Sequence, residues 1–170
     1  MKCKRMIYVI LVVLMLFGLT ACGKDQAKDP NELKIGSYEL LYKGAKLMKD
    51  YDGNDAIVLT LDYTNNSKET TSYLWSVVET ATQNGAELEM ATIFISEDSF
   101  DTVTESQFSD VEPGATMEIQ VAYELKDTTS EVELIFEEIL GNKSGKLTID
   151  PSTLSRETDG NDTESSADET

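Results

Sequence analysis

Alternation of apolar and polar side chains is the feature that most constrains how this chain can fold. It is cleanest in residues 116–124, and the same period of two recurs in residues 131–137 and 146–150. In residues 56–64 it places Ile57 on one face of a strand and Val58 on the other. Successive side chains of a half-buried antiparallel β-strand point to opposite faces, so these segments predict an antiparallel β-sheet protein.

Three further segments carry weaker strand signals: residues 38–47, 73–81 and 87–95. Turn sequences separate the segments, and Asn84-Gly85 is the best hairpin candidate because both residues accept positive φ. Seven or eight short strands with turns at this spacing predict a β-sandwich. We expect Trp75 in its core, on the strand face of Tyr73; the alternative is an exposed aromatic side chain that stacks on a ligand sugar. The irregular residues 96–110 predict a short helix or a loop that crosses between sheets.

The N-terminal segment is built like an export signal. Three basic residues, Lys2, Lys4 and Arg5, precede an unbroken apolar run from Met6 to Phe17, which is too short to span a bilayer. Leu19, Thr20, Ala21 and Cys22 follow, and this tetrapeptide resembles the lipobox of bacterial lipoproteins. The resemblance implies that Cys22 receives a diacylglyceryl group and becomes the first residue of the mature protein. Stable anchoring by lipid needs two acyl chains, and a diacylglyceryl group supplies both. An ordinary secretory signal with a chance cysteine and an uncleaved anchor are the alternatives.

These features divide the chain into four parts. Residues 1–21 are the expected signal peptide, residues 22–34 a polar tether, residues 35–150 the β-sandwich and residues 151–170 an acidic tail. The tail is rich in Ser, Thr and carboxylates, so it cannot bury enough apolar surface to offset the entropy of ordering, and we predict that it is disordered. An acidic interaction tail is the alternative.

The composition restricts the chemistry available to the chain. It carries 32 acidic and 14 basic residues, a net charge of −18, and removal of Lys2, Lys4 and Arg5 with the signal leaves −21. A polyanion is repelled by phosphate backbones and anionic head groups, which disfavours nucleic-acid binding. The chain has no histidine, which excludes Ser-His-Asp catalysis and disfavours most zinc, copper and iron sites, so we expect no cofactor. Its two cysteines are Cys3, within the signal, and Cys22, so no disulfide is expected.

Three segments together resemble a known family: residues 61–67 (LDYTNNS), 82–89 (TQNGAELE) and 111–125 (VEPGATMEIQVAYEL). This order resembles the family known as domain of unknown function 5067. In that order, a strand ends in a Thr-Asn-x-Ser turn, a Gln-x-Gly-x-x-Leu hairpin follows, and a Pro-Gly pair precedes a long strand. The resemblance implies a lipoprotein of Gram-positive bacteria with an immunoglobulin-like β-sandwich, akin to the immunoprotective extracellular proteins of mycobacteria. It implies no catalytic residue, and each motif residue also has a structural role in a turn or strand.

Two acidic segments are candidate sites. Asp50, Asp52, Asn54 and Asp55 form a calcium candidate, because oxygen ligands at alternate positions are typical of a Ca²⁺ loop. The EF-hand pattern needs Gly and Glu where this chain has Asp55 and Leu61, so a charged hairpin loop is the competing interpretation.

Glu97 and Asp101 are the second candidate, since paired carboxylates can hydrolyse glycosides; an acidic loop is the alternative. From all of this the sequence predicts a non-enzymatic lipoprotein on the outer face of the cytoplasmic membrane, with an envelope protein or glycan as its partner. A carboxylate-dependent glycan hydrolase and a calcium-binding surface protein are the other hypotheses.

Overall fold

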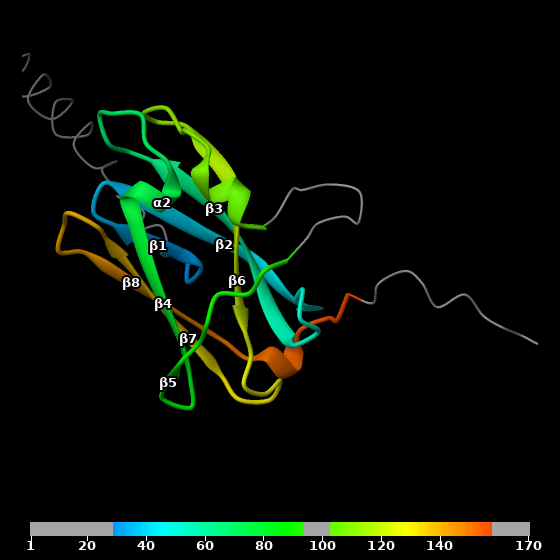
Figure 1. Cartoon of the computed structure of the whole chain (residues 1–170). Coiled ribbons are helices and arrows are strands. Elements are labelled where there is room, and N and C mark those ends of the chain that lie inside the picture. Colours follow the sequence, from blue (N-terminus) through cyan, green and yellow to red (C-terminus); the bar gives the residue numbers. More distant parts are fainter. Residues whose placement is uncertain (1–28, 94–102, 158–170) are drawn as a thin grey trace, which may run out of the picture.

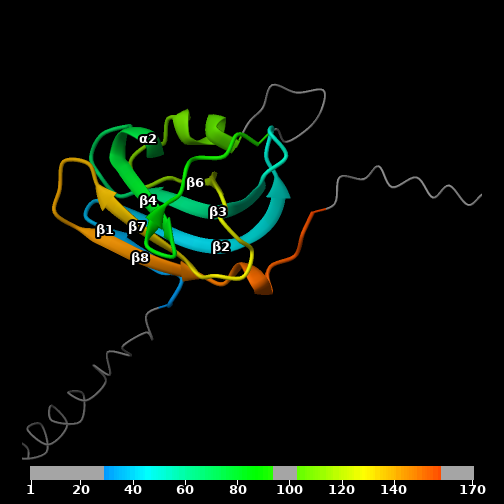
Figure 2. The same ribbon diagram turned by 60° about the horizontal axis from the view of Figure 1, so that its bottom comes forward.

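Two antiparallel sheets pack face to face in the computed structural model, which describes residues 29–93 and 103–157 (Figures 1 and 2). Each sheet has four strands, so the predicted antiparallel β-sandwich of seven or eight strands is confirmed. The strands of the first sheet, in spatial order, are β1 (Glu32–Ile35), β2 (Tyr38–Lys49), β3 (Asp55–Asn65) and β6 (Thr116–Glu124). Those of the second sheet are β5 (Ala86–Glu87), β4 (Val77–Gln83), β7 (Val132–Glu138) and β8 (Ser144–Ile149).

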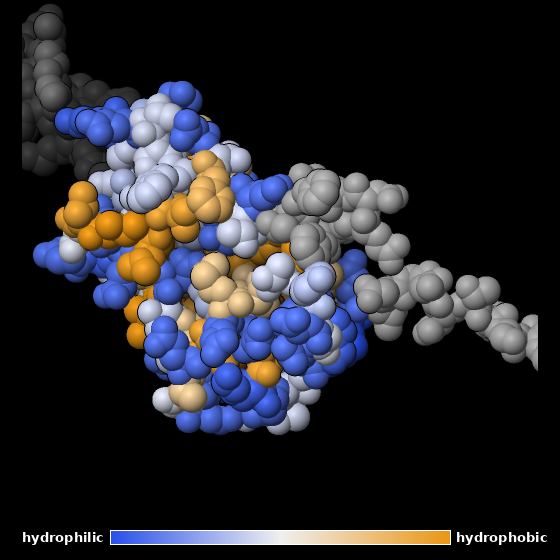
Figure 3. All heavy atoms as spheres, in the orientation of Figure 1, coloured by the Kyte–Doolittle hydropathy of each residue, from blue (hydrophilic) through white to orange (hydrophobic). Residues whose placement is uncertain are grey.

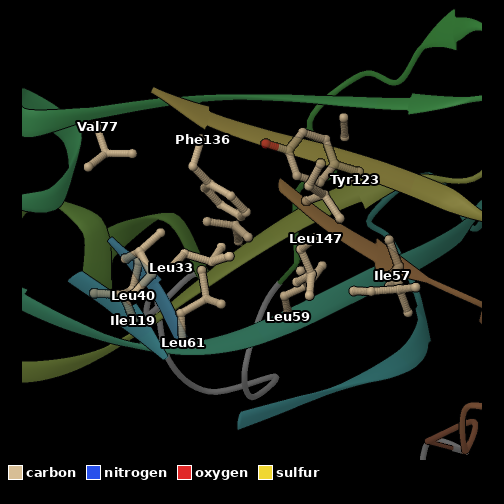
Figure 4. Close-up of a cluster of buried hydrophobic side chains, with 14 of the residues drawn as sticks. Leu33, Leu40, Ile57, Leu59, Leu61, Val77, Ile119, Tyr123, Phe136 and Leu147 are labelled. Carbon is tan, nitrogen blue, oxygen red and sulfur yellow. The ribbon is translucent and has the colours of Figure 1, made fainter. Parts of the chain in front are cut away.

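The core lies between the sheets and is built by the alternating positions. Figure 4 shows Leu40, Leu59, Leu61 and Ile119 from the first sheet directed toward Phe136 from the second. All five side chains are fully buried. Burial of each such side chain stabilises the fold by about 1.5–3 kcal/mol, so packing alone can hold a domain without disulfides.

Strand β3 is buried on both of its faces. Val58 lies on the face opposite Ile57, as predicted, and is buried there against Val103 and Ile93 in a second, smaller cluster. Val103 begins the 3-10 helix η1 (Val103–Phe108), which lies above β3 and β6 in Figure 2. The irregular part of the chain therefore supplies a short helix, as one of the two alternatives expected, and this helix covers the first sheet.

The predicted hairpin is confirmed, but the strands around it are shorter than expected. Asn84 and Gly85 both have positive φ, 54° and 78°, which is the geometry of a tight two-residue turn between β4 and β5. After Glu87 the chain leaves the second sheet. Met90 forms a bridge to Tyr123, and the amide of Ala91 donates to the carbonyl of Ala122, so this segment follows the edge of β6 instead. The prediction of a strand over residues 87–95 is thus wrong in the part that the structure describes.

The sandwich extends beyond both predicted boundaries. Strand β1 begins at Glu32, inside the range expected to be tether, because Leu33 and Ile35 alternate inward and pair with β2. At the other end the 3-10 helix η2 (Pro151–Thr153) follows β8, and Leu47 then exchanges backbone hydrogen bonds with Ser155 and Glu157. Strand β1 has only four residues and leaves this part of the β2 edge open for the later segment. Residues 158–170, the remainder of the predicted tail, lie outside the described residues.

Candidate functional site

Large apolar side chains gather on the surface at one end of the second sheet. Trp75 is 75% exposed, Val78 50%, Ile139 42% and Leu140 99%, and we call these four residues the apolar patch. Figure 3 shows hydrophobic residues gathered over the region where α2 (Tyr73–Ser76), the start of β4 and the turn between β7 and β8 lie in Figure 1. A monomeric domain gains nothing from leaving such side chains in water, so contiguous exposed apolar surface marks an interaction site.

Backbone pairing brings the two parts of the apolar patch together. Val77 at the start of β4 pairs with Glu138 at the end of β7, and the amide of Ile139 donates to the carbonyl of Ser76 at 3.1 Å. The short helix that carries Trp75 is thereby held beside the turn that carries Leu140. Because these contacts are made by the backbone, the apolar patch is formed before any partner arrives.

Glu138 fixes the turn that presents Leu140. Its carboxylate accepts a hydrogen bond from the amide of Ser37 at 3.2 Å and lies against Gly36 and Gly141. A Cβ atom built on Gly36 or Gly141 would come within 2.0 or 1.7 Å of Glu138 Oε2, so both positions need glycine for this carboxylate to keep its place. The turn is therefore tied to the β1–β2 connection.

The structure overturns the expectation that Trp75 lies in the core. Residues 73–76 form one helical turn rather than the start of a strand, so Tyr73 and Ser76 face inward and Trp75 faces solvent. Positions three apart share a face of a helix, whereas positions two apart share a face of a strand. The period-two argument therefore assigned Trp75 to the wrong face.

A partly buried glutamate connects the two sheets next to this region. Glu79 points inward from β4, and the hydroxyl of Tyr73 donates to its Oε2 at 2.8 Å. Tyr123 on β6 also hydrogen-bonds to it. Burial raises the pKa of Glu79, although both tyrosine bonds act to lower it. Burial likewise raises the pKa of Tyr73 well above its usual range, so the phenol stays protonated and remains a donor. The partners of the carboxylate are the phenols of Tyr73 on α2 and Tyr123 on β6, and the second of these joins β4 to the opposite sheet.

We expect Glu79 to make stability depend on pH. Its pKa is higher in the folded than in the unfolded chain, so between the ordinary value of 4.5 and the raised folded value the folded state binds more protons. The free energy of unfolding that Glu79 contributes therefore falls as pH rises through this window. Urea unfolding of wild type and Glu79→Gln at several pH values should show the difference between them changing in the window, whereas exposed Glu137→Gln should track the wild type. Parallel curves for Glu79→Gln would contradict the assignment.

The residues of the calcium candidate contact one another or nearby cations. Asp50 accepts hydrogen bonds from the backbone amide of Asn54 at 2.7 Å and from its side-chain amide at 3.3 Å, which closes the turn. Asp55 is held by Lys49 and Arg156 instead, and these cations lower its pKa. Asp52 contributes to a repulsive acidic environment around Glu124. Within residues 29–93 and 103–157 no group of three or more acidic side chains is arranged to hold a metal ion.

The other predicted sites fall elsewhere. Glu97 and Asp101 lie outside the described residues, as do Leu19, Thr20, Ala21 and Cys22 of the lipobox. No helix in the described ranges is both long and apolar enough to cross a membrane.

Comparison with known proteins identifies the family. Residues 23–138 match the family described as a domain of unknown function, DUF5067. The chain belongs to the DUF5067 family. The expected family resemblance is therefore confirmed, and the match begins at the residue directly after Cys22. A comparison with curated proteins found no match.

Solved structures of bacterial proteins are similar to this DUF5067 chain. A protein described as a "putative lipoprotein" from Staphylococcus aureus has a TM-score of 0.55 and 15% identity, over 75% of this chain and 98% of its own. A protein from Enterococcus faecalis has a TM-score of 0.50 and 19% identity, over 71% and 91%. An uncharacterised β-sandwich protein from Clostridium difficile aligns with a TM-score of 0.48 and 14% identity, over 69% and 89%. At these identities the first two show a common fold.

The motif residues of the DUF5067 chain are buried structural groups. Gln83, from the Gln-x-Gly-x-x-Leu hairpin, is 1% exposed and bonds the β6–β7 connection. Asn65, from the Thr-Asn-x-Ser turn, is fully buried, and its side-chain amide donates to the carbonyls of Glu69 and Val111. Sequence reasoning assigned these amides to turns, and the structure shows that they also tie loops to the core. Leu140, the most exposed residue of the apolar patch, belongs to no motif that the sequence presented.

Proposed function

We propose that this DUF5067 chain is a lipoprotein anchored through Cys22 to the outer face of the cytoplasmic membrane. Its β-sandwich would act there as a non-catalytic binding or accessory module for a protein or glycan of the envelope. One observation carries the proposal: the match to the family begins at residue 23, immediately after the lipobox Leu19-Thr20-Ala21-Cys22. The export signal, the acylation site and the folded domain thus follow one another in the order that a lipoprotein requires.

The chemistry of the chain supports a binding role. The whole sequence lacks histidine, so no imidazole can serve as a general base or a metal ligand. The partly buried carboxylate of Glu79 is engaged by Tyr73 and Tyr123, and Asp55 is engaged by Lys49 and Arg156.

Acylation of Cys22 can be tested directly, because the chain has one other cysteine. In Gram-positive cells that express the protein and are fed an alkyne analogue of palmitate, we expect the wild type to carry the label and Cys22→Ala to carry none. Cys3→Ala is the matched control. It removes the thiol in the segment that is cleaved away, so it should leave labelling unchanged. Label that persists in Cys22→Ala, or that disappears in Cys3→Ala, would refute the proposed anchor.

A further inference from the structure

We propose that the apolar patch is a second membrane contact, docking on the same bilayer in which the lipid on Cys22 is inserted. This inference rests on the proposed lipid anchor and adds an orientation to it: the end of the sandwich that carries Trp75 and Leu140 faces the phospholipid. Three observations favour a bilayer as the occupant of the apolar patch.

The first is where the described chain begins. Asp29 and Pro30 line one groove together with Ser144, Gly145 and Lys146, so the chain from the anchor reaches the domain beside the start of β8. Seven peptide units separate Cys22 from Asp29 and extend at most about 25 Å. Leu140 is only four residues from Ser144, a separation of at most about 14 Å along the chain. The apolar patch therefore lies within reach of the surface that holds the lipid.

The second is the local charge. The segment from Ile139 to Ile149 contains two lysines and no carboxylate, in a chain with 32 acidic residues. Lys146 is paired with Glu133, while Lys143 stands exposed on the turn next to Leu140. The nearby Glu138 is folded back onto the amide of Ser37, so the exposed Glu137, opposite Val78 on β7, is the carboxylate that stands beside the turn. The turn is thus an exception to the negative charge that repels the rest of the chain from anionic head groups.

The third is the kind of side chains exposed. A tryptophan beside aliphatic residues is typical of protein surfaces at the membrane interface, where the indole ring keeps its N–H near water while the ring enters the apolar layer. A few such side chains bind a bilayer only marginally when the protein is free in solution. Here the lipid on Cys22 already holds the domain at the surface, so docking is intramolecular and a weak contact is sufficient.

Trp75 is the sole tryptophan of the chain, so its fluorescence reports on this surface alone. The acylated full-length protein is reconstituted in vesicles of equimolar phosphatidylcholine and phosphatidylglycerol, with and without bromine on the acyl chains. Flotation of the vesicles measures anchoring, and quenching of Trp75 by the brominated chains measures docking. We expect the wild type to float and to be quenched. Because the contact is mainly apolar, quenching should persist at high salt.

Leu140→Asp is the test variant, since a side chain that is 99% exposed can be changed without affecting the core. It should still float, while the ratio of docked to undocked domain falls at least tenfold and quenching declines toward that of unbrominated vesicles. Met90→Asp is the matched control, because Met90 is also an exposed apolar residue, with 54% of its surface accessible. It lies away from the apolar patch: Met90 bridges Tyr123, and Tyr123 pairs with Ile57 near the start of β3, whereas the apolar patch lies near the end of β3. It should remain quenched. Circular dichroism establishes that both variants are folded.

The outcomes separate the two proposals. Protein that does not float refutes the anchor and, with it, the docking. Protein that floats with Trp75 unquenched overturns the docking alone, and so does Leu140→Asp that is quenched as strongly as the wild type. If the occupant is instead a second copy of the chain, Trp75 remains unquenched on vesicles and the detergent-solubilised protein sediments as a dimer that Leu140→Asp dissociates.

Discussion

Replacing Gln83 by leucine is expected to lower the free energy of unfolding by about 3 kcal/mol or more. The side-chain amide donates to the carbonyls of Asp127 and Ser130, both at 2.8 Å. Its Oε1 accepts from the backbone amides of Lys126 and Asp127 at 2.8 and 3.2 Å. Leucine fills a similar volume but leaves these backbone groups without their partner, and each buried polar group left unpaired costs about 1–3 kcal/mol.

Urea unfolding followed by circular dichroism measures this loss, because Trp75 is exposed and is a poor reporter of the core. Thr82→Leu is a suitable control, since Thr82 is the neighbouring residue on β4 and faces away from the loop that Gln83 holds. We expect the control to change stability by less than about 0.5 kcal/mol. Equal stabilities for Gln83→Leu and Thr82→Leu would show that the hydrogen bonds of Gln83 do not hold the β6–β7 connection.

Most of the sandwich could be predicted from periodicity. The segment predicted over residues 116–124 is β6 in full, and the one over 56–64 differs from β3 by a single residue at each end. These strands have one face against the common core, so their alternation is imposed by burial and is visible in the sequence. The strand predicted over residues 87–95 is wrong in its described part because Met90 and Ala91 pair with the edge of β6, and edge contacts leave no comparable pattern in the sequence.

The candidate site was much less predictable than the fold. Trp75 lies on the opposite face from the one predicted, because a helical turn of four residues interrupts the alternation of the strand. So short a turn leaves no periodic signal in the sequence. Leu140 lies in a loop. An apolar residue in a loop belongs to no periodic pattern, so the sequence does not indicate which way it faces. The apolar patch arises only when the pairing of Val77 with Glu138 brings the helix and the turn together. Such long-range proximity is a property of topology, which a single sequence does not show.

The family motifs were visible in the sequence, but the long-range contacts that they make were not. Asn65 was predicted as a turn residue and Gln83 was noted only within the hairpin motif, yet each supplies a buried amide that satisfies backbone groups of other loops. Gly114, in the Pro-Gly pair of the third motif, donates its amide to the carbonyl of Asn65 at 2.6 Å, so two motifs meet in space. Motifs of this kind identify a common architecture. They say little about a ligand, which agrees with a functional surface formed by residues outside them.

The meeting point of these motifs gives the second large effect: Asn65→Ala should lower the free energy of unfolding by about 2–3 kcal/mol. The side-chain amide of Asn65 donates to the carbonyls of Glu69 and Val111, both at 2.8 Å, and its Oδ1 accepts from the amide of Ser67 at 2.9 Å. Alanine cannot replace these bonds, and the carbonyl of Val111 loses a buried donor.

The adjacent Asn66 provides a control of the same residue type. Its side chain is exposed, and its backbone amide, which donates to the carbonyl of Ser37, is retained in Asn66→Ala. We therefore expect a change below about 0.5 kcal/mol for Asn66→Ala in the same urea titration. If the two substitutions cost the same, the turn geometry rather than the buried amide explains the motif. If only Asn65→Ala is destabilising, the side chain of Asn65 acts as a clamp between the end of β3 and the segment that leads into β6.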